Sequence, residues 1–323
     1  MSGTAAKPPD KLKRLLNRLR TFSYYNIVVY IVLLNLAFIF LYPFLYMLAT
    51  SFKSYSDLMD VTVKWFPREF TPGNWMLALK ELGILPNEEA VSALPRPLIN
   101  SVVVSLAATL GHVLSCSFVA YGFARFNFPL KNVLFVLVIV TLIVPAQTLI
   151  VSQNALYSTV GWTDSVLPLI VPAFLGMGLK GGLFIFLFRQ SFMKLPPALE
   201  EAAAIDGCNP YYTYLRIIIP TSGPVMLVCS ILSVVWHWND YFEPFIYIHS
   251  SEKYLLPQML PDMMETLKAM QISVDEGDLL LRQSYTMGMI MAGTAIVVAP
   301  LVIMYFILQG RFAQSIDRTG LVE

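Results

Sequence analysis

The sequence predicts an all-α integral membrane protein with six transmembrane helices, and three observations support this class. Of the 323 residues, 56% are hydrophobic and 13% are charged, whereas soluble domains carry about 25% charged residues. One soluble core cannot bury so much apolar surface, so lipid is the natural solvent for the excess. The other two observations are the long apolar runs and the placement of Lys and Arg between them. A net charge of +1 offers no basic field for nucleic acid.

Six apolar segments approach the roughly 20 residues that a helix needs to cross a hydrocarbon core about 30 Å thick. The predicted spans are residues 27–49, 98–120, 133–151, 166–188, 217–238 and 285–308. Prolines lie inside them or at their edges, at Pro43, Pro145, Pro168, Pro172, Pro224 and Pro300. Membrane helices tolerate such prolines when neighbouring groups satisfy the freed carbonyls. We therefore expect kinked helices and, where a break lines a pathway, discontinuous ones.

The distribution of Lys and Arg orients these spans. The segment before the first span is basic, so the positive-inside rule places the N-terminus in the cytoplasm, and six spans return the C-terminus there. The loop at residues 152–164 has no Lys or Arg and is expected outside. The expected organisation is a cytoplasmic basic segment (1–26), a first transmembrane helix (27–49), an external loop (50–97), a five-helix core (98–310) with a cytoplasmic coupling loop (194–220) and an external loop (240–283), and a cytoplasmic tail (311–323).

The chain lacks the motifs of an enzyme. It contains no Gly-Lys pair, so it has no Walker A loop and cannot hydrolyse ATP by that route. Gly176 to Gly181 matches the dinucleotide fingerprint by letter, but it lies inside an apolar run, where close packing by small residues is the better explanation. His112, His237 and His249 are not at metal-ligand spacing and are expected to be buried or interfacial polar groups. We expect no catalytic residue, no metal and no cofactor in this chain.

Residues 194–220 form a polar interruption between the fourth and fifth spans. Pro197 suits a helix start, and Glu200 and Glu201 complement the helix dipole in the first turn. Gly207 suits the left-handed residue that ends a helix. These signals predict a short helix from about Pro197 to Asp206. Asn209, followed by Pro210, predicts the cap of a second helix that runs toward Pro220.

The first of these helices has the character of a docking element. Helical spacing puts small or apolar side chains together with a carboxylate, namely Ala198, Ala202 and Ile205 beside Glu201 and Ala204. Small side chains let another surface approach the backbone closely. The alternative is a helix that rests on the bilayer surface, but such a helix is expected to carry Lys or Arg on its polar face. This one carries Glu200, Glu201 and Asp206.

This segment resembles the EAA loop of ABC importer permeases, whose pattern is Glu-Ala-Ala, three residues, Gly, nine residues, Ile, one residue, Leu-Pro. The matching residues are Glu201, Ala202, Ala203, Gly207, Ile217 and Pro220, with Ile219 in place of the usual Leu. Further similarities point to the carbohydrate branch and, within it, to the second permease of heterodimeric oligosaccharide importers of the maltose type: Asn100, Ala120-Tyr121, Ala124-Arg125, Phe188-Arg189-Gln190 and Trp238-Asn239-Asp240. Glu243 departs from the pattern at a place that is usually aromatic.

The resemblance implies a type I ABC importer permease fold and a transport subunit that performs no chemistry itself. Its implied partners are a second, similar permease, two ATP-binding subunits that bind ATP and Mg, an extracytoplasmic sugar-binding protein and membrane lipid. The implied coupling residues are Glu200, Glu201, Ala202, Ala203, Asp206 and Gly207. The alternatives are a permease of the same mechanism for another solute, such as a peptide or a phosphonate, and a secondary transporter.

Four residues are candidates for the substrate pathway. Lys180 is the one ionisable group placed well inside a predicted span, and a cation facing the cavity would suit an acidic oligosaccharide. Snorkelling, a helix break at the glycines or a displaced span boundary would also account for it. Trp236 and Trp238 could stack on sugar rings or anchor a membrane interface, and Asn239 follows them.

Overall fold

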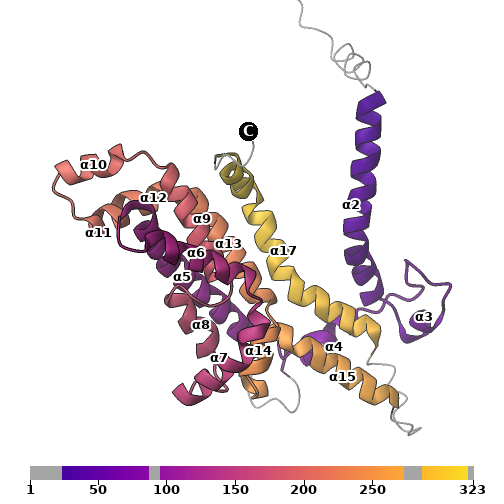
Figure 1. Ribbon diagram of the computed structural model, residues 1–323. Helices are drawn as coiled ribbons and strands as arrows, with labels where there is room; N and C mark the ends of the chain where they lie inside the picture. Colours follow the sequence, from indigo (N-terminus) through magenta and orange to yellow (C-terminus); the bar gives the residue numbers. More distant parts are fainter. Residues whose placement is uncertain (1–23, 87–94, 273–285, 319–323) are drawn as a thin grey trace, which may run out of the picture.

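The computed structural model describes residues 24–86, 95–272 and 286–318, and within these ranges the secondary structure is helical without strands (Figure 1). The all-α prediction is therefore confirmed. The predicted basic segment lies almost entirely outside the described residues, and so do residues 319–323 of the predicted tail.

The first predicted span is α2 (Tyr24–Ser51), which stands apart from the other long helices over most of its length (Figure 1). None of its apolar window is buried within the chain. The predicted external loop that follows is partly helical, since it contains α3 (Tyr55–Met59) and α4 (Gly73–Glu81). α4 packs against α17 (Met287–Arg318), so this loop is a folded part of the molecule.

A buried polar junction joins these elements at the end of α2. Lys53 is 4% exposed, and its Nζ donates to the carbonyls of Val63 and Lys64 at 2.8 and 2.9 Å. Asn74 donates from Nδ2 to the carbonyl of Lys53 at 2.9 Å. Gly288 of α17 lies against this amide, because a Cβ there would be 2.5 Å from Asn74 Nδ2. A side chain at position 288 would displace this amide from the carbonyls of Ser51 and Lys53 to which it donates.

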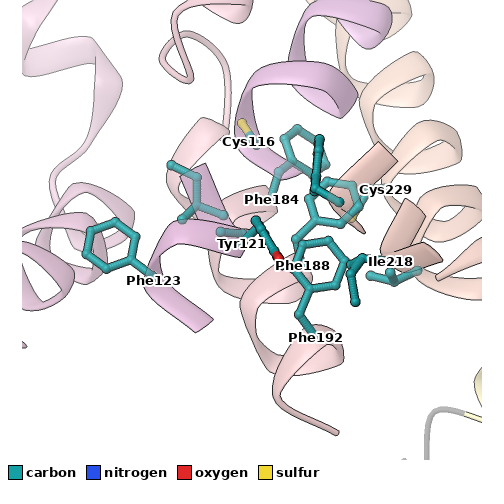
Figure 2. Close-up of a cluster of buried hydrophobic side chains, with 12 residues drawn as sticks. Cys116, Tyr121, Phe123, Phe184, Phe188, Phe192, Ile218 and Cys229 are labelled. Carbon is teal, nitrogen blue, oxygen red and sulfur yellow. The ribbon is translucent and has the colours of Figure 1, made fainter. Parts of the chain in front are cut away.

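The long helix α5 (Arg96–Arg125) lies at the centre of the bundle and packs against α8 (Leu167–Phe174), α9 (Gly181–Lys194) and α13 (Gly223–Asn239). Its cluster with α9 and α13 is largely aromatic (Figure 2). The buried side chains labelled there are Cys116, Tyr121, Phe123, Phe184, Phe188, Phe192, Ile218 and Cys229. Three phenylalanines of α9 thus fill the space beside α5.

Two predicted spans are bent helix pairs. The third consists of α6 (Lys131–Ile143) and α7 (Ala146–Val160), which meet at 104° around Pro145. α7 also continues into the segment predicted as an external loop. The fifth begins with α11 (Pro210–Thr213), a π-helical turn (Tyr214–Ile218) and α12 (Ile219–Thr221), and bends by 80° into α13. Pro145 and Pro220 lack the N–H that a continuous helix needs at these places.

By length and apolarity, three described helices could cross a membrane, or up to five spans when each bent pair counts as one. The fourth predicted span is divided into α8 and α9 by residues 175–180, so neither helix reaches the length of a span. The last is α17, which extends beyond the predicted end at residue 308 into the predicted tail.

The elements sort to two ends of the molecule. The N-terminal end of α2, the C-terminal end of α17 and α10 (Ala198–Ile205) lie toward one end, at the top of Figure 1. The opposite end holds α3, α7, α14 (Phe242–Tyr247) and α15 (Met259–Ile272).

Candidate functional site

α10 ends as its sequence predicts. Gly207 has a φ of +78°, and its N–H donates to the carbonyl of Ala204 at 3.1 Å. The next amide, of Cys208, donates to the carbonyl of Ala203 at 2.9 Å. This pair of bonds is a Schellman motif, in which a left-handed glycine closes the last turn. The predicted helix from Pro197 to Asp206 is thereby confirmed to within one residue at each end.

The second helix also starts where the sequence predicts. Asn209 is extended, and its Oδ1 accepts a hydrogen bond from the Tyr212 N–H at 2.8 Å. Pro210 occupies the first helical position, where no N–H is needed. Further on, the hydroxyl of Tyr214 lies 2.7 Å from Ser117 Oγ and so fastens this segment to α5. The bent pair therefore has a fixed position on the bundle.

One face of α10 is open. Ala203 is 3% exposed and packs inward, whereas Ile205 is 87% exposed. The other exposed residues of this face are Ala198, Glu201, Ala202, Ala204 and Asp206. Among the described residues, the carboxylates of Glu201 and Asp206 have no ion-pair partner. We call this set of residues the α10 face: small and apolar, with two available negative charges.

Glu200 is held in an ion pair within the chain. Its Oε1 lies 2.8 Å from Arg125 Nε, and the two side chains are only 22% and 13% exposed. Arg125 also donates to the carbonyl of Leu195 at 2.9 Å. Glu200 therefore ties the end of α5 to the start of α10, and Glu201, the carboxylate predicted to meet a basic partner, is the outward-facing acid of the two.

The second feature is the interruption between α8 and α9, which we call the break (residues 175–180). Three of its residues adopt left-handed backbone: Gly176 at φ +74°, Gly178 at +82° and Lys180 at +63°. Glycine adopts this region at no steric cost. The glycines that match a dinucleotide fingerprint thus serve to interrupt a helix, and no strand precedes them within the described part of the chain.

The break packs against the middle of α5. His112 Nε2 donates to the carbonyl of Met177 at 2.9 Å, and Ser115 Oγ donates to the carbonyl of Ala173 at 2.6 Å. Gly111 permits this approach, because a Cβ there would lie 2.9 Å from the backbone nitrogen of Phe174. Helix α5 therefore holds the end of α8 and the first part of the break.

A chain of buried polar groups continues from the break to α13. With Nε2 of His112 acting as donor, its Nδ1 accepts from Ser233 Oγ at 3.3 Å. Thr109 Oγ1 lies 3.0 Å from the same hydroxyl, and the rings of His112 and His237 are 5.2 Å apart. The prediction of buried polar histidines is confirmed for both, whereas His249 is exposed. The network itself was not predicted, although both histidines interrupt apolar runs.

The four residues predicted for the substrate pathway differ in exposure. Lys180 is exposed, and it lies in the break instead of within a helix. Trp238 is 5% exposed, and its Nε1 donates to the carbonyl of Val297 at 2.9 Å, so it anchors α13 to α17. Trp236 is half-buried against Phe184, and Asn239 is exposed. In this conformation Trp238 has no free face for a sugar ring.

The described residues contain no group of three or more His, Cys, Asp or Glu side chains that could hold a metal ion. Neither the α10 face nor the break presents a nucleophile beside a base. The first is an exposed surface of small residues with two carboxylates, and the second is an interruption between two helices that carries one cation.

Comparisons with known proteins agree with this arrangement. The family model described as "Binding-protein-dependent transport system inner membrane component" matches residues 112–318. A "probable ABC transporter permease protein" of Pyrococcus horikoshii is 30% identical over 221 residues, which are 68% of this chain and 76% of the relative. The arabinooligosaccharides transport system permease protein AraQ of Halalkalibacterium halodurans is 25% identical over 287 residues, 88% of this chain and 92% of the relative.

Among solved structures, the fold matches a chain in the crystal structure of a bacterial ABC transporter involved in the import of the acidic polysaccharide alginate. The TM-score is 0.71, with 95% of this chain and 100% of that chain covered. At 19% sequence identity, the match shows a shared fold.

Proposed function

The chain belongs to the family of inner membrane components of binding-protein-dependent transport systems, and on this premise we propose that it is a permease subunit of an ATP-driven importer for sugars, most simply oligosaccharides. It forms the translocation pathway with a second permease. Two ATP-binding subunits power the cycle, and an extracytoplasmic binding protein delivers the sugar. The single observation that carries the coupling role is the α10 face, an exposed small-residue surface with two available carboxylates.

The oligosaccharide class is supported by two lines of similarity. AraQ is named for arabinooligosaccharides, and it aligns with most of this chain. The motifs around Asn100, Phe188 and Trp238 resemble those of the carbohydrate branch. A permease of the same mechanism for another solute is the second candidate, and it shares every structural feature except the cargo.

We further propose six spans with both termini in the cytoplasm. Two bent pairs and three long helices supply five spans, and α8 together with α9 supplies the sixth. Figure 1 supports this layout, since the N-terminal end of α2, the C-terminal end of α17 and α10 lie toward the same end. Lys194 and Arg216 flank the α10 segment at that end, in agreement with the positive-inside rule.

The proposed mechanism transmits motion and involves no chemistry in this subunit. A cleft of an ATP-binding subunit receives the α10 face, where Glu201 and Asp206 meet basic groups and the alanines allow close approach. Closure of the ATP-binding pair displaces α10. The Arg125–Glu200 pair and the Tyr214–Ser117 contact pass the displacement to α5. Because α5 packs on α8, α9 and α13, the core moves with it.

The docking role is tested by a charge reversal on the α10 face. The complete importer, with both permeases, the ATP-binding subunits and the binding protein, is reconstituted in proteoliposomes, and ATP-driven sugar uptake is measured. Glu201→Lys is expected to reduce uptake at least about tenfold, because a buried interfacial charge pair contributes several kcal/mol. Glu69→Lys makes the same charge change at an exposed site of the opposite end and is expected to retain uptake. Intact uptake by an assembled Glu201→Lys complex would sink the docking role.

The cargo class is tested separately. The genes adjacent to this one are expected to encode a binding protein and a partner permease, and the purified binding protein is expected to bind an oligosaccharide in calorimetric titrations. A binding protein that takes a peptide or a phosphonate would move the proposal to the second candidate. A secondary transporter would need neither neighbour.

A further inference from the structure

The break lies at mid-membrane depth. α5 has 30 residues and is long and apolar enough to cross a membrane as one helix. Gly111 and His112 lie at the middle of that helix. Gly111 contacts Phe174, the last residue of α8, and His112 contacts Met177, in the break. Residues 175–180 are therefore level with the centre of α5, far from both ends of the bundle.

Exposed backbone at this depth cannot face lipid. Gly178 is exposed, and because it has no side chain the exposed surface is backbone. Among the described residues, the amides of Gly178, Leu179 and Lys180 donate no backbone hydrogen bond. In hydrocarbon each unsatisfied polar group costs several kcal/mol, so irregular backbone at membrane depth occurs only inside protein or beside a water-filled cavity. The exposed side of the break must face one of these.

Lys180 indicates which of these two surroundings, protein interior or a water-filled cavity, the break faces. Its side chain is exposed, and no acidic partner for it exists in the part of the chain that the structure describes. Its stem of four methylene groups is far shorter than half of a hydrocarbon core about 30 Å thick, so it cannot reach the interface by snorkelling. A cation in this position needs water or an anion next to it. A water-filled pathway that carries an anionic solute supplies both.

We propose that the break lines the translocation pathway and that Lys180 binds an anionic group, a carboxylate or a phosphate, on the transported sugar. This proposal rests on the proposed function and deepens it by naming a substrate class. Charge-assisted hydrogen bonds to an ionised group contribute about 1.5–3 kcal/mol, which corresponds to roughly 10- to 100-fold in transport efficiency. The glycines beside Lys180 have no side chains, so a sugar ring can come close to the backbone there.

The first test asks whether position 180 faces water in the assembled importer. Cys116 and Cys229 are buried, and Cys208 is changed to serine to provide a quiet background. Lys180→Cys is expected to react with a membrane-impermeant cationic thiol reagent, and reaction is expected to slow when transported sugar is present. Ile39→Cys, at an exposed apolar site in the middle of α2, is the control and is expected to stay unlabelled. If the Lys180→Cys variant stays unreactive while a cysteine placed in an exposed loop reacts, the pathway assignment is overturned.

The second test asks about charge. Sugars that the wild-type importer takes up are compared in matched pairs, such as trigalacturonate against its methyl ester and glucose 6-phosphate against glucose. Lys180→Met is expected to lower uptake of the charged member at least about tenfold and to leave the neutral member within about twofold, while Lys180→Arg retains both.

The outcomes separate the two proposals. A wild-type importer that takes up sugars but only uncharged ones overturns the anion assignment and leaves the proposed function standing. The same holds if Lys180→Met loses charged and neutral sugars equally, as expected when Lys180 pairs with an acid of the second permease, or if it loses neither. A wild-type complex that imports no sugar at all instead overturns the proposed cargo.

Discussion

Arg125 and Glu200 form an ion pair, with 2.8 Å between Nε and Oε1, that joins the C-terminal end of α5 to α10 across 75 positions of sequence. Both side chains are mostly buried, and Arg125 makes a second hydrogen bond to the carbonyl of Leu195. A pair in such surroundings holds its geometry better than an exposed one, because removing one partner leaves the other charge partly desolvated. The position of the α10 face on the bundle therefore depends on it.

We expect a charge swap to expose this dependence. Arg125→Glu and Glu200→Arg are each expected to lower ATP-driven uptake several-fold, and the double variant is expected to recover part of the loss. The coupling energy from the double-mutant cycle should be at least about 1.5–3 kcal/mol, the range of charge-assisted hydrogen bonds, because each single variant also places two like charges together. Additive losses in the double variant would show that the pair does not act as a unit.

Gly207 provides a second prediction, based on backbone conformation. No atom lies within 4 Å of a Cβ placed there, so Gly207→Ala meets only the cost of its φ of +78°, about 1–2 kcal/mol for a non-glycine residue. We expect reduced coupling of ATP hydrolysis to uptake, and a milder loss for Gly207→Asn. Gly223→Ala also has open space but no positive φ, and serves as the control. Equal effects at both positions would contradict the prediction.

Two glycines of α5 form a matched pair for packing. Gly111→Ala would place a Cβ 2.8 Å from Phe174 Cδ2 and 2.9 Å from its backbone nitrogen, whereas Gly122→Ala meets nothing within 4 Å. Overpacking against backbone costs about 1–3 kcal/mol, so Gly111→Ala should lower the thermal unfolding midpoint of the purified complex. Gly122→Ala should leave it unchanged or raise it slightly, because alanine favours helix by about 1 kcal/mol over glycine. The reverse order would show that α8 is not held where the structure has it.

A variant of Trp238 tests whether this side chain anchors α13 to α17 or stacks on the sugar. Trp238→Phe retains most of the buried ring but removes the hydrogen bond from Nε1 to the Val297 carbonyl. We expect a loss of about 0.5–1.5 kcal/mol in stability with the KM for sugar unchanged. A raised KM at unchanged stability would return Trp238 to the pathway.

Asp164 predicts a pH dependence at the end of the molecule proposed to be external. Hydrogen bonds from the Lys253 ammonium, the Ser250 hydroxyl and the amides of Ser250 and His249 hold the pKa of its carboxyl well below the usual range. A depressed carboxyl pKa stabilises the folded state above the unfolded pKa of about 3.9, and this contribution is lost as the pH falls through and below that value.

Protection of the His249 and Ser250 amides from hydrogen exchange should therefore be constant between about pH 5 and pH 8 and should fall below about pH 4, after correction for intrinsic exchange. In Asp164→Asn the protection should be low throughout. Unchanged protection in this variant would show that the loop is held by other contacts.

The local signals of the proposed docking element could be read from the sequence. Gly207 and Asn209 act through backbone geometry within a few residues, so the helix end and the cap were both predicted correctly. The Arg125–Glu200 pair could not be predicted, because it depends on α5 and α10 meeting in space. Without it, Glu200 and Glu201 look equivalent, although only Glu201 faces outward.

The apolar spans show a similar limit. Hydropathy measures how much apolar surface a segment carries and says nothing of its continuity, so residues 133–151 and 166–188 were each predicted as one span, with kinks expected at their prolines. The structure bends the first at Pro145 and interrupts the second at Gly176 and Gly178. These residues were visible in the sequence, but whether a proline or glycine kinks a helix or divides it depends on the neighbours that satisfy the freed groups, here His112 and Ser115.

Helix α5 has one further consequence, which concerns timing. His112, at the break, and Arg125, at α10, are 13 residues apart on a helix that contains no proline between them, a distance of about 20 Å at 1.5 Å per residue. A continuous helix of this length keeps the distance between its ends fixed. In the proposed importer, a state with the ATP-binding subunits closed and the break still in its earlier position would require α5 to bend or the Arg125–Glu200 pair to open. We therefore expect such a state to be high in free energy, and the two ends of α5 to move in the same step.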